Sequence, residues 1–186
     1  IIYDLPIHSH DIHNILKLID KHPFPCIFVE KELMYINYHN DAVQIVQDAI
    51  STPLPDIQDI NRAYSHPIYQ VIPYDITSQK ENIILDIMPH CQKTRWHELA
   101  IDIIPKTGGK QNGIREVLKH YDIQPEETMA FGDGHNDIDM FEFVGLSIAM
   151  GNATQELKEV ASDVTDDIDH DGIYNALVKY NILQKD

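Results

Sequence analysis

Thr128-Met-Ala-Phe-Gly-Asp-Gly-His-Asn-Asp137 is the stretch of sequence that decides the fold of this chain. It opens with a short apolar run, Thr128 to Phe131, which we predict to be a buried strand. The two glycines after the run allow a tight turn, and we expect a helix to follow. Asp133 and Asp137 offer the oxygen ligands that a hard cation prefers, and the free N–H groups of a first helical turn suit a phosphate. The stretch therefore predicts a binding turn at the end of a strand.

A capped loop is the alternative interpretation of this turn. A single Gly-Asp pair would indicate only a solvated loop with an aspartate that caps a helix. Here the pattern Gly-Asp-x-x-Asn-Asp places two carboxylates and the amide of Asn136 directly after a buried strand. Asn136 can donate a hydrogen bond to a phosphoryl oxygen or hold a neighbouring carboxylate. This density of polar groups favours a site that binds a cation and a phosphate over a capped loop.

Strands and helices alternate on both sides of the turn. We predict strands at 128–131 and 146–149, and helices at 110–121, 137–144, 154–161 and 172–180. Such alternation is typical of a parallel, doubly wound α/β sheet. In these sheets ligands bind beyond the carboxyl ends of the strands, which is where the polar turn lies.

The first half of the chain has a different pattern, in which prolines break short apolar runs. We predict helices at 11–20 and 41–50, a hairpin that pairs 26–29 with 34–37, and strands at 68–72, 84–88 and 99–104. This mixture is typical of a small α+β unit. We therefore predict two domains, with a boundary between residues 98 and 99.

The charge balance of the chain is strongly acidic, because 30 Asp and Glu oppose 14 Lys and Arg for a formal net charge of −16. Such a field repels nucleic acids and anionic membranes, so we expect neither as a partner. It also repels phosphorylated small molecules, so phosphate chemistry here must bring a metal, a lysine or both. Cys26 and Cys91 lie far apart and outside any CxxC spacing, which favours reduced thiols in a cytoplasmic protein.

Three blocks occur in a fixed order, namely Lys110-Gln-Asn-Gly-Ile, Gly132-Asp-Gly-His-Asn-Asp137 and Ala149-Met-Gly-Asn-Ala153, and Asp171-Gly-Ile precedes the last predicted helix. This pattern resembles the haloacid-dehalogenase superfamily, specifically its Cof-type phosphatase branch. The resemblance implies a Rossmann-like core with a parallel sheet, of which this chain holds the C-terminal half. It also implies an α+β cap domain of the C2 type, so that residues 1–98 set the substrate specificity and residues 99–186 form the half core.

The resemblance implies a Mg²⁺-dependent phosphatase, a hydrolase that acts on a small phosphorylated metabolite through an aspartyl-phosphate. A sugar phosphate is the first substrate class that it suggests, and a nucleotide-like cofactor phosphate is the second. Lys110 matches the lysine that screens charge between the nucleophile and the substrate phosphate. Asp133 matches the acidic Mg²⁺ ligand, and Asp137 matches the second acid, which supports the metal directly or through water. Asn136 matches a position near the phosphoryl group, so Lys110 and Asn136 are the candidate catalytic and phosphate-binding residues.

Charge compensation is the physical reason for these residue types. A carboxylate that approaches a phosphate meets a repulsion of about 4 kcal/mol per charge pair at 4 Å, with an effective dielectric constant near 20. A magnesium ion and a lysine together bring three positive charges to offset this repulsion and hold the reacting atoms in line.

The nucleophile that the resemblance calls for is the first Asp of an Asp-x-Asp-Gly-Thr motif, which this sequence does not contain. Asp4 is the nearest candidate, but Pro6 stands where the acid–base Asp belongs and His8 stands where Thr belongs. We therefore expect the chain by itself to be inactive. We also expect a missing N-terminal segment, or another chain, to cover the open edge of the core sheet.

Two alternatives from other classes remain open. The first is a non-catalytic remnant of the family that binds a phosphate or a protein partner. The second is a structural metal-binding module built on His8, His10 and His13, since His-x-His spacing is common at zinc sites. The predicted helix start near Asp11 divides the three histidines between a loop and a helix, which favours a solvated, N-capping stretch.

Overall fold

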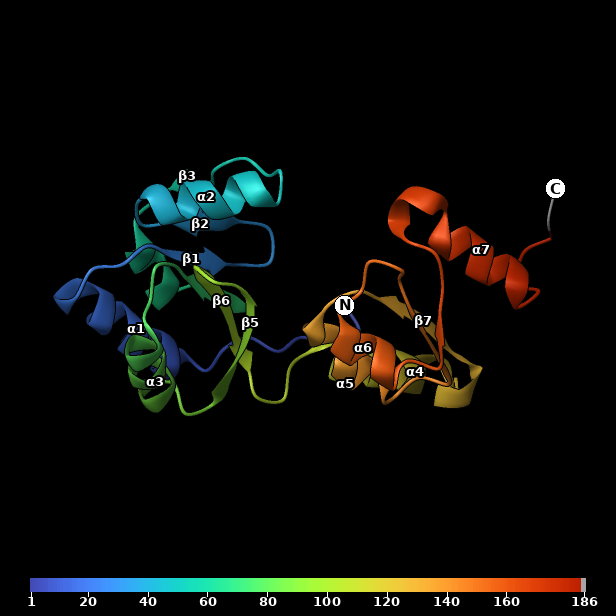
Figure 1. The fold of residues 1–186 in the computed structure, drawn as a ribbon. Helices are drawn as coiled ribbons and strands as arrows, with labels where there is room; N and C mark the ends of the chain where they lie inside the picture. Colours follow the sequence, from blue (N-terminus) through green and yellow to red (C-terminus); the bar gives the residue numbers. More distant parts are fainter. Residues whose placement is uncertain (185–186) are drawn as a thin grey trace. The chain divides into compact units, whose positions relative to one another are not determined.

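The computed structural model describes residues 1–184, which divide into two compact units (Figure 1). We call Asp4–Gly109 the mixed-sheet unit, and we call Ile1–Tyr3 together with Lys110 and the residues after it the parallel-sheet unit. The predicted boundary between residues 98 and 99 falls too early. Strand β6 (Ala100–Pro105) pairs antiparallel with both β4 (Gln70–Pro73) and β5 (Cys91–His97), so it belongs to the mixed sheet.

The mixed-sheet unit is built on six strands in the order β3-β2-β1-β4-β6-β5. The remaining strands of this sheet are β1 (Cys26–Val29), β2 (Met34–Ile36) and β3 (Asp56–Ile57). The helices are α1 (Ser9–Lys21), α2 (Asp41–Ala49) and α3 (Ser78–Ile87), with a 3-10 turn at Ile60–Tyr64. The predicted hairpin is confirmed, because β1 and β2 pair antiparallel with Ile27 opposite Ile36. The predicted helices at 11–20 and 41–50 are confirmed as α1 and α2.

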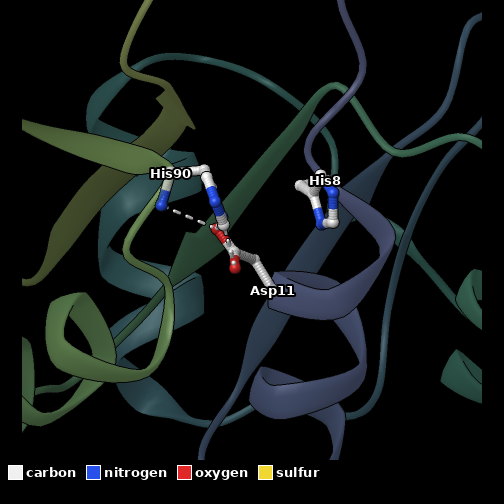
Figure 2. Close-up of side chains that lie close together, drawn as sticks. All are labelled: His8, Asp11 and His90. Carbon is white, nitrogen blue, oxygen red and sulfur yellow. Dashed lines mark hydrogen bonds and ion pairs between the residues drawn. The ribbon is translucent and has the colours of Figure 1, made fainter.

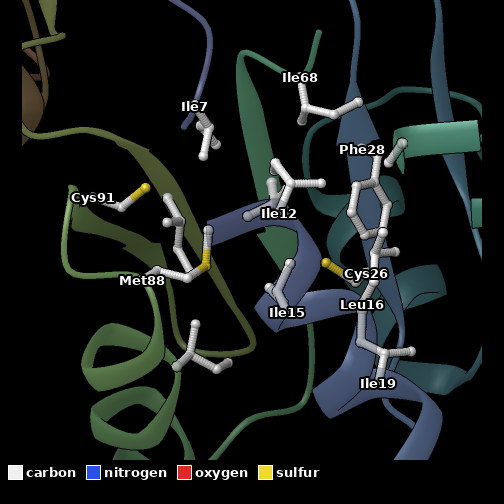
Figure 3. Packing of buried hydrophobic residues seen from close by; sticks show 14 of the residues in the cluster. Ile7, Ile12, Ile15, Leu16, Ile19, Cys26, Phe28, Ile68, Met88 and Cys91 are labelled. Carbon is white, nitrogen blue, oxygen red and sulfur yellow. The ribbon is translucent and has the colours of Figure 1, made fainter. Parts of the chain in front are cut away.

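Both faces of the mixed sheet are covered, and β1 shows how the sequence divides its side chains between them. Cys26 and Phe28 belong to the larger core, where α1 and α3 pack on the sheet (Figure 3). Ile27, between them in sequence, belongs to the smaller core that α2 covers on the opposite face. This division follows from the two-residue repeat of a strand, which sends successive side chains to opposite faces.

The strand predicted at 84–88 is wrong, because these residues belong to the end of helix α3. The side chain of Thr77 caps this helix by accepting a hydrogen bond from the N–H of Lys80 at 3.3 Å. Ile84 and Met88 are fully buried four residues apart, whereas Ile83 is exposed. That spacing is helical, but a short apolar run rich in isoleucine does not distinguish a strand from a buried helix. The neighbouring strand β5 was not predicted.

The parallel-sheet unit contains three parallel strands in the order β7-β8-β9, namely β7 (Met129–Gly132), β8 (Leu146–Ala149) and β9 (Asp163–Val164). Its helices are α4 (Lys110–Tyr121), α5 (Ile138–Phe141), α6 (Gln155–Val160) and α7 (Gly172–Lys179). Short 3-10 turns lie at Pro125–Glu127, His135–Asp137 and Ile168–His170. The predicted alternation is confirmed, although the helix predicted at 137–144 is shorter and begins as the turn His135–Asp137.

The core of the parallel-sheet unit lies between β8 and helices α5 and α6, where Met140, Phe141, Ala149 and Leu157 are buried together. Strand β7 lies at the edge of the described sheet and pairs only with β8 among the described residues. Its residues 129–131 are half-buried, whereas residues 147–149 of β8 are buried. Across the described residues, every helix is too short or too polar to cross a membrane.

Candidate active site

The polar turn follows directly after β7, and backbone hydrogen bonds connect it to the end of β8. The N–H of Met150 donates to the carbonyl of Gly132 at 3.0 Å, and the N–H of Thr154 donates to the carbonyl of Asp133 at 3.0 Å. The two strands are parallel, with Gly132 opposite Ala149, so their carboxyl ends lie at the same edge. The turn therefore lies where the switch-point rule places ligand sites.

The carboxylate of Asp137 organises the turn. Its Oδ2 accepts the backbone N–H of Asp133 at 3.0 Å and that of Gly134 at 3.2 Å. Its Oδ1 accepts a hydrogen bond from the Nζ of Lys110, at the start of α4, and the two side chains form an ion pair. One buried carboxylate thus holds the turn after β7 and the first residue of α4 together.

Two glycines make room for this arrangement. A Cβ on Gly132 would lie 2.8 Å from Oδ2 of Asp137, and a Cβ on Gly134 would lie 2.6 Å from Oδ1 of Asn136. Real Cβ atoms essentially never approach other heavy atoms this closely. The glycines are therefore needed for the close approach of the polar side chains, in addition to the tight turn that the sequence predicts.

The electrostatics of Asp137 favour its ionised form. Burial acts to raise the pKa of this carboxyl, but the hydrogen bonds from Lys110, Gly134 and Asp133 outweigh burial and hold the pKa below its usual value. Asp137 is 3% exposed, while Lys110 is 48% exposed, so the ammonium lies at the border between the turn and solvent. The hydrogen bond to Asp137 therefore holds the positively charged ammonium of Lys110 at the mouth of the turn.

The structure brings the four predicted site residues into one turn and the adjoining helix start. Lys110 contacts Asp137, Asp137 holds the backbone of Asp133, and Asn136 packs against Gly134. The side chains of Asp133 and Asn136 are exposed, whereas that of Asp137 is engaged on both oxygens.

Sequence reasoning missed Thr154, which connects the turn to the next element. Its N–H binds the carbonyl of Asp133, and its Oγ1 accepts from the N–H of Leu157 at 3.4 Å and so caps α6. A threonine directly before an acidic first helical turn was the available signal for this cap. His135 also contributes at the rim of the turn, where its Nδ1 lies 3.1 Å from Oε2 of Glu156.

The donor set at the turn fits a magnesium ion. Mg²⁺ prefers carboxylate oxygens and water, and proteins commonly hold it with one or two carboxylates while the substrate phosphate supplies more ligands. Asp133 is exposed just after the end of β7, and its backbone N–H donates a hydrogen bond to the carboxylate of Asp137. These residues are all oxygen donors, which suits a hard cation rather than a thiophilic one.

A family model for haloacid dehalogenase-like hydrolases matches residues 1–177 of this chain. The chain belongs to the haloacid dehalogenase-like hydrolases. It is 32% identical over 186 residues to the putative phosphatase YkrA of Bacillus subtilis (strain 168), and the match covers 99% of this chain and 71% of that protein. The predicted family and the predicted enzyme class, a phosphatase or hydrolase of the haloacid dehalogenase type, are therefore confirmed.

Solved structures of haloacid dehalogenase-like phosphatases match nearly the whole chain. The HAD subclass IIB sugar phosphatase BT4131 matches with a TM-score of 0.83 and 33% identity, over 98% of this chain and 70% of that one. A second match is BT1666 from Bacteroides thetaiotaomicron, from a study of phosphatases of this superfamily. It matches with a TM-score of 0.83 and 27% identity, over 97% of this chain and 67% of that one. The predicted fold class is confirmed, with a Rossmann-like parallel-sheet core and an α+β cap that corresponds to the mixed-sheet unit.

Proposed function

We propose that this haloacid dehalogenase-like protein is a Mg²⁺-dependent phosphatase of a small phosphorylated metabolite, and that the metabolite is a sugar phosphate. The observation that carries the proposal is the pairing of Lys110 with the buried Asp137, whose other oxygen holds the backbone of the exposed Asp133. The similarity to a sugar phosphatase of HAD subclass IIB supports the substrate class.

Each residue of the turn has a role in this proposal. Asp133 binds the magnesium ion directly, and Asp137 supports the metal site by fixing the turn and orienting Lys110. Lys110 and Asn136 bind the phosphoryl oxygens. The magnesium ion, when bound, neutralises negative charge on the phosphate and on the groups that surround it.

Lys110 is the cation that this strongly acidic chain places at the site. With a net charge of −16, the protein repels an anionic substrate at long range. The Lys110 side chain is 48% exposed and its ammonium is held by Asp137, so the ammonium offers local attraction without a large reorganisation on binding. Neutralising Lys110 should therefore weaken both substrate binding and turnover.

The nucleophile, in this proposal, is a carboxylate that attacks the phosphorus while the P–O bond to the substrate's alcohol breaks and the alcohol leaves with a proton. Water then hydrolyses the resulting aspartyl-phosphate, which releases inorganic phosphate and restores the carboxylate. We propose that it lies on a further strand that pairs with the open edge of β7. Two features support an additional packing partner. Strand β7 lacks a second neighbour among the described residues, and large apolar side chains near α7 are exposed, namely Ile168, Ile173, Tyr174, Ile182 and Leu183.

This strand belongs to the rest of a longer protein or to another chain. The chain spans 71% of YkrA and 70% of the BT4131 chain, so both of these proteins contain additional residues that could include such a strand. Unpaired strand edges with apolar faces also invite aggregation, which a paired strand prevents. We further propose a cytoplasmic location, which the buried, free thiols of Cys26 and Cys91 support.

Steady-state kinetics of the longer protein with an aryl phosphate and a panel of sugar phosphates test the proposal. Asp133→Ala should abolish the Mg²⁺-dependent turnover, and Lys110→Ala should lower kcat by on the order of 10²–10³, the usual cost of removing one charge-stabilising group. Glu142→Gln is the matched control, because Glu142 is an exposed acid of the same unit.

Two results would contradict the phosphatase assignment. The first is turnover in Asp133→Ala or Lys110→Ala that equals that of the control. The second is phosphate binding without turnover of any ester by the longer protein, which would favour the non-catalytic alternative. The 186-residue chain alone should show no activity, and activity in that sample would overturn the proposed origin of the nucleophile.

A further inference from the structure

A second cluster of chemically active side chains lies in the mixed-sheet unit, at the start of α1. His8 and Asp11 come from the beginning of this helix, and His90 comes from the segment just before β5 (Figure 2). Ligand atoms of these three side chains lie within 4.8 Å of one another. This set replaces the sequence-based trio, because His13 instead packs on Tyr64, with 4.9 Å between the ring centres.

The carboxylate of Asp11 lies at the centre of the cluster. It is fully buried, and its Oδ2 accepts the backbone N–H of His90 at 3.0 Å. Its Oδ1 lies 3.1 Å from the Nδ1 of His90. The backbone therefore fixes Oδ2, and the Nδ1 of His90 lies close to both oxygens, since it is 3.3 Å from Oδ2 as well.

The two imidazoles lie on the solvent side of this carboxylate. Their rings stack with 4.7 Å between centres, and both side chains are exposed. The Sγ of Cys91 lies 3.6 Å from Oδ2 of Asp11, in the interior of the unit. The Nδ1 of His10 lies 3.7 Å from Oδ1 of Asp11, farther than the Nδ1 of His90 at 3.1 Å. It contacts the side-chain amide of Asn14 at 3.3 Å.

We propose that His8, Asp11 and His90 form a binding site for a divalent transition metal of the Zn²⁺ class. Two imidazoles and one carboxylate are a ligand set that such ions prefer, and water completes the coordination. The hydrogen bond from the N–H of His90 to Oδ2 orients the carboxylate, as outer ligands commonly do at metal sites. Both rings are exposed, so an ion can reach them from solvent. The Nδ1 of His8 also caps α1 by accepting the N–H of His10 at 3.3 Å.

This site differs in chemistry from the turn after β7. The turn offers oxygen donors and suits Mg²⁺, whereas the His8–Asp11–His90 site offers two nitrogen donors and suits a softer ion. The metal would connect the first turn of α1 to the segment that leads into β5, two segments separated by about eighty residues of chain. Its expected effect is therefore to stabilise the mixed-sheet unit.

Isothermal titration calorimetry with ZnCl₂ tests this inference, on the longer protein freed of transition metals and kept in excess Mg²⁺. We expect one equivalent of Zn²⁺ to bind and to raise the melting temperature of the wild-type protein. Co²⁺ in place of Zn²⁺ should give the visible absorption of a nitrogen- and oxygen-ligated ion. His8→Asn, which keeps an N-capping side chain, and His90→Gln should each weaken Zn²⁺ binding more than about tenfold, since even an outer-shell change costs 10–100-fold.

His13→Ala and Asp133→Ala serve as controls, because the first removes a histidine of the same helix outside the cluster and the second alters the magnesium turn. Both should bind Zn²⁺ like the wild type. Wild-type affinity in His8→Asn and His90→Gln would overturn the proposal, as would displacement of Zn²⁺ by millimolar Mg²⁺. A loss of binding in His13→Ala as large as in His90→Gln would also contradict it.

Discussion

Replacing Asp137 by Asn tests whether one buried carboxylate organises the turn. The two side chains have nearly the same shape, but aspartate accepts hydrogen bonds on both oxygens and asparagine accepts on one only. In the wild type, Oδ2 accepts from two backbone N–H groups and Oδ1 accepts from Lys110. In either orientation of the amide, an NH₂ group must therefore face at least one donor.

The cost of this change follows from the contacts. Asparagine will keep its oxygen toward the N–H groups of Asp133 and Gly134, which weakens two charge-assisted bonds to neutral ones, a loss of about 1 kcal/mol each. Losing the ion pair with Lys110 adds only about 0.5 kcal/mol to this cost, because the lysine side chain is 48% exposed and solvent screens its charge. We expect the free energy of unfolding to fall by about 2–3 kcal/mol, which is large beside typical domain stabilities of roughly 5–15 kcal/mol.

Urea denaturation measures this loss, and amide hydrogen exchange locates it. Exchange at the N–H groups of residues 133 and 134 should accelerate in Asp137→Asn and stay unchanged in Glu142→Gln, the exposed control. An unchanged unfolding midpoint together with unchanged exchange at these amides would refute the role assigned to Asp137.

The pH dependence gives an independent check of the same contact. The folded state lowers the pKa of Asp137 below its ordinary value of 3.8. A lowered pKa means that the stabilisation is complete above the unfolded value and disappears as the pH falls through the folded value. The stability difference between wild type and Asp137→Asn should therefore be constant near neutral pH and shrink at pH values below 3.8.

The remaining predictions concern the glycine beside Asp137 and the two cysteines. Gly132→Ala should displace the Asp137 carboxylate and lower the free energy of unfolding by about 1–3 kcal/mol, as overpacking does. The melting temperature measures this loss, and the amide exchange rate at residue 134 reports the displacement. A variant as stable as the wild type would contradict the 2.8 Å approach. Burial raises the pKa of the Cys26 thiol, and burial with the nearby Asp11 raises the pKa of Cys91 to about 12, so neither should react with a thiol reagent at neutral pH until denaturant is added. Rapid labelling of either thiol in the folded protein would count against its buried position.

The turn after β7 was predictable from sequence because its determinants are local. An apolar run, two glycines and the polar residues between Asp133 and Asp137 lie within one short segment, and the following strand β8 has the predicted bounds. Family resemblance alone placed Lys110 in the same site as Asp133 and Asp137, since no local rule brings the start of α4 to this turn. Which carboxylate the ammonium contacts required the structure.

Features that depend on distant pairing were not predictable. The apolar run before Met88 satisfies both strand and helix patterns, and its helical state follows from the cap at Thr77 and from packing against α1. The boundary at residue 109 follows from the pairing of β6 with its neighbours. Likewise, His90 meets Asp11 across 79 residues of sequence, so a local search selected His13 in its place.

The division of the chain into an interrupted unit and an inserted one has a consequence for the order of folding. The parallel-sheet unit draws its residues from both sides of Asp4–Gly109, so the contacts of residues 1–3 with it must close a loop of more than a hundred residues. Closing a flexible loop of that length carries a large entropic cost. The mixed-sheet unit has its own cores and can collapse without those contacts. If the mixed-sheet unit folds first, residues 4–109 become a compact body in place of a long flexible loop. Forming the contacts of residues 1–3 afterwards then costs far less chain entropy.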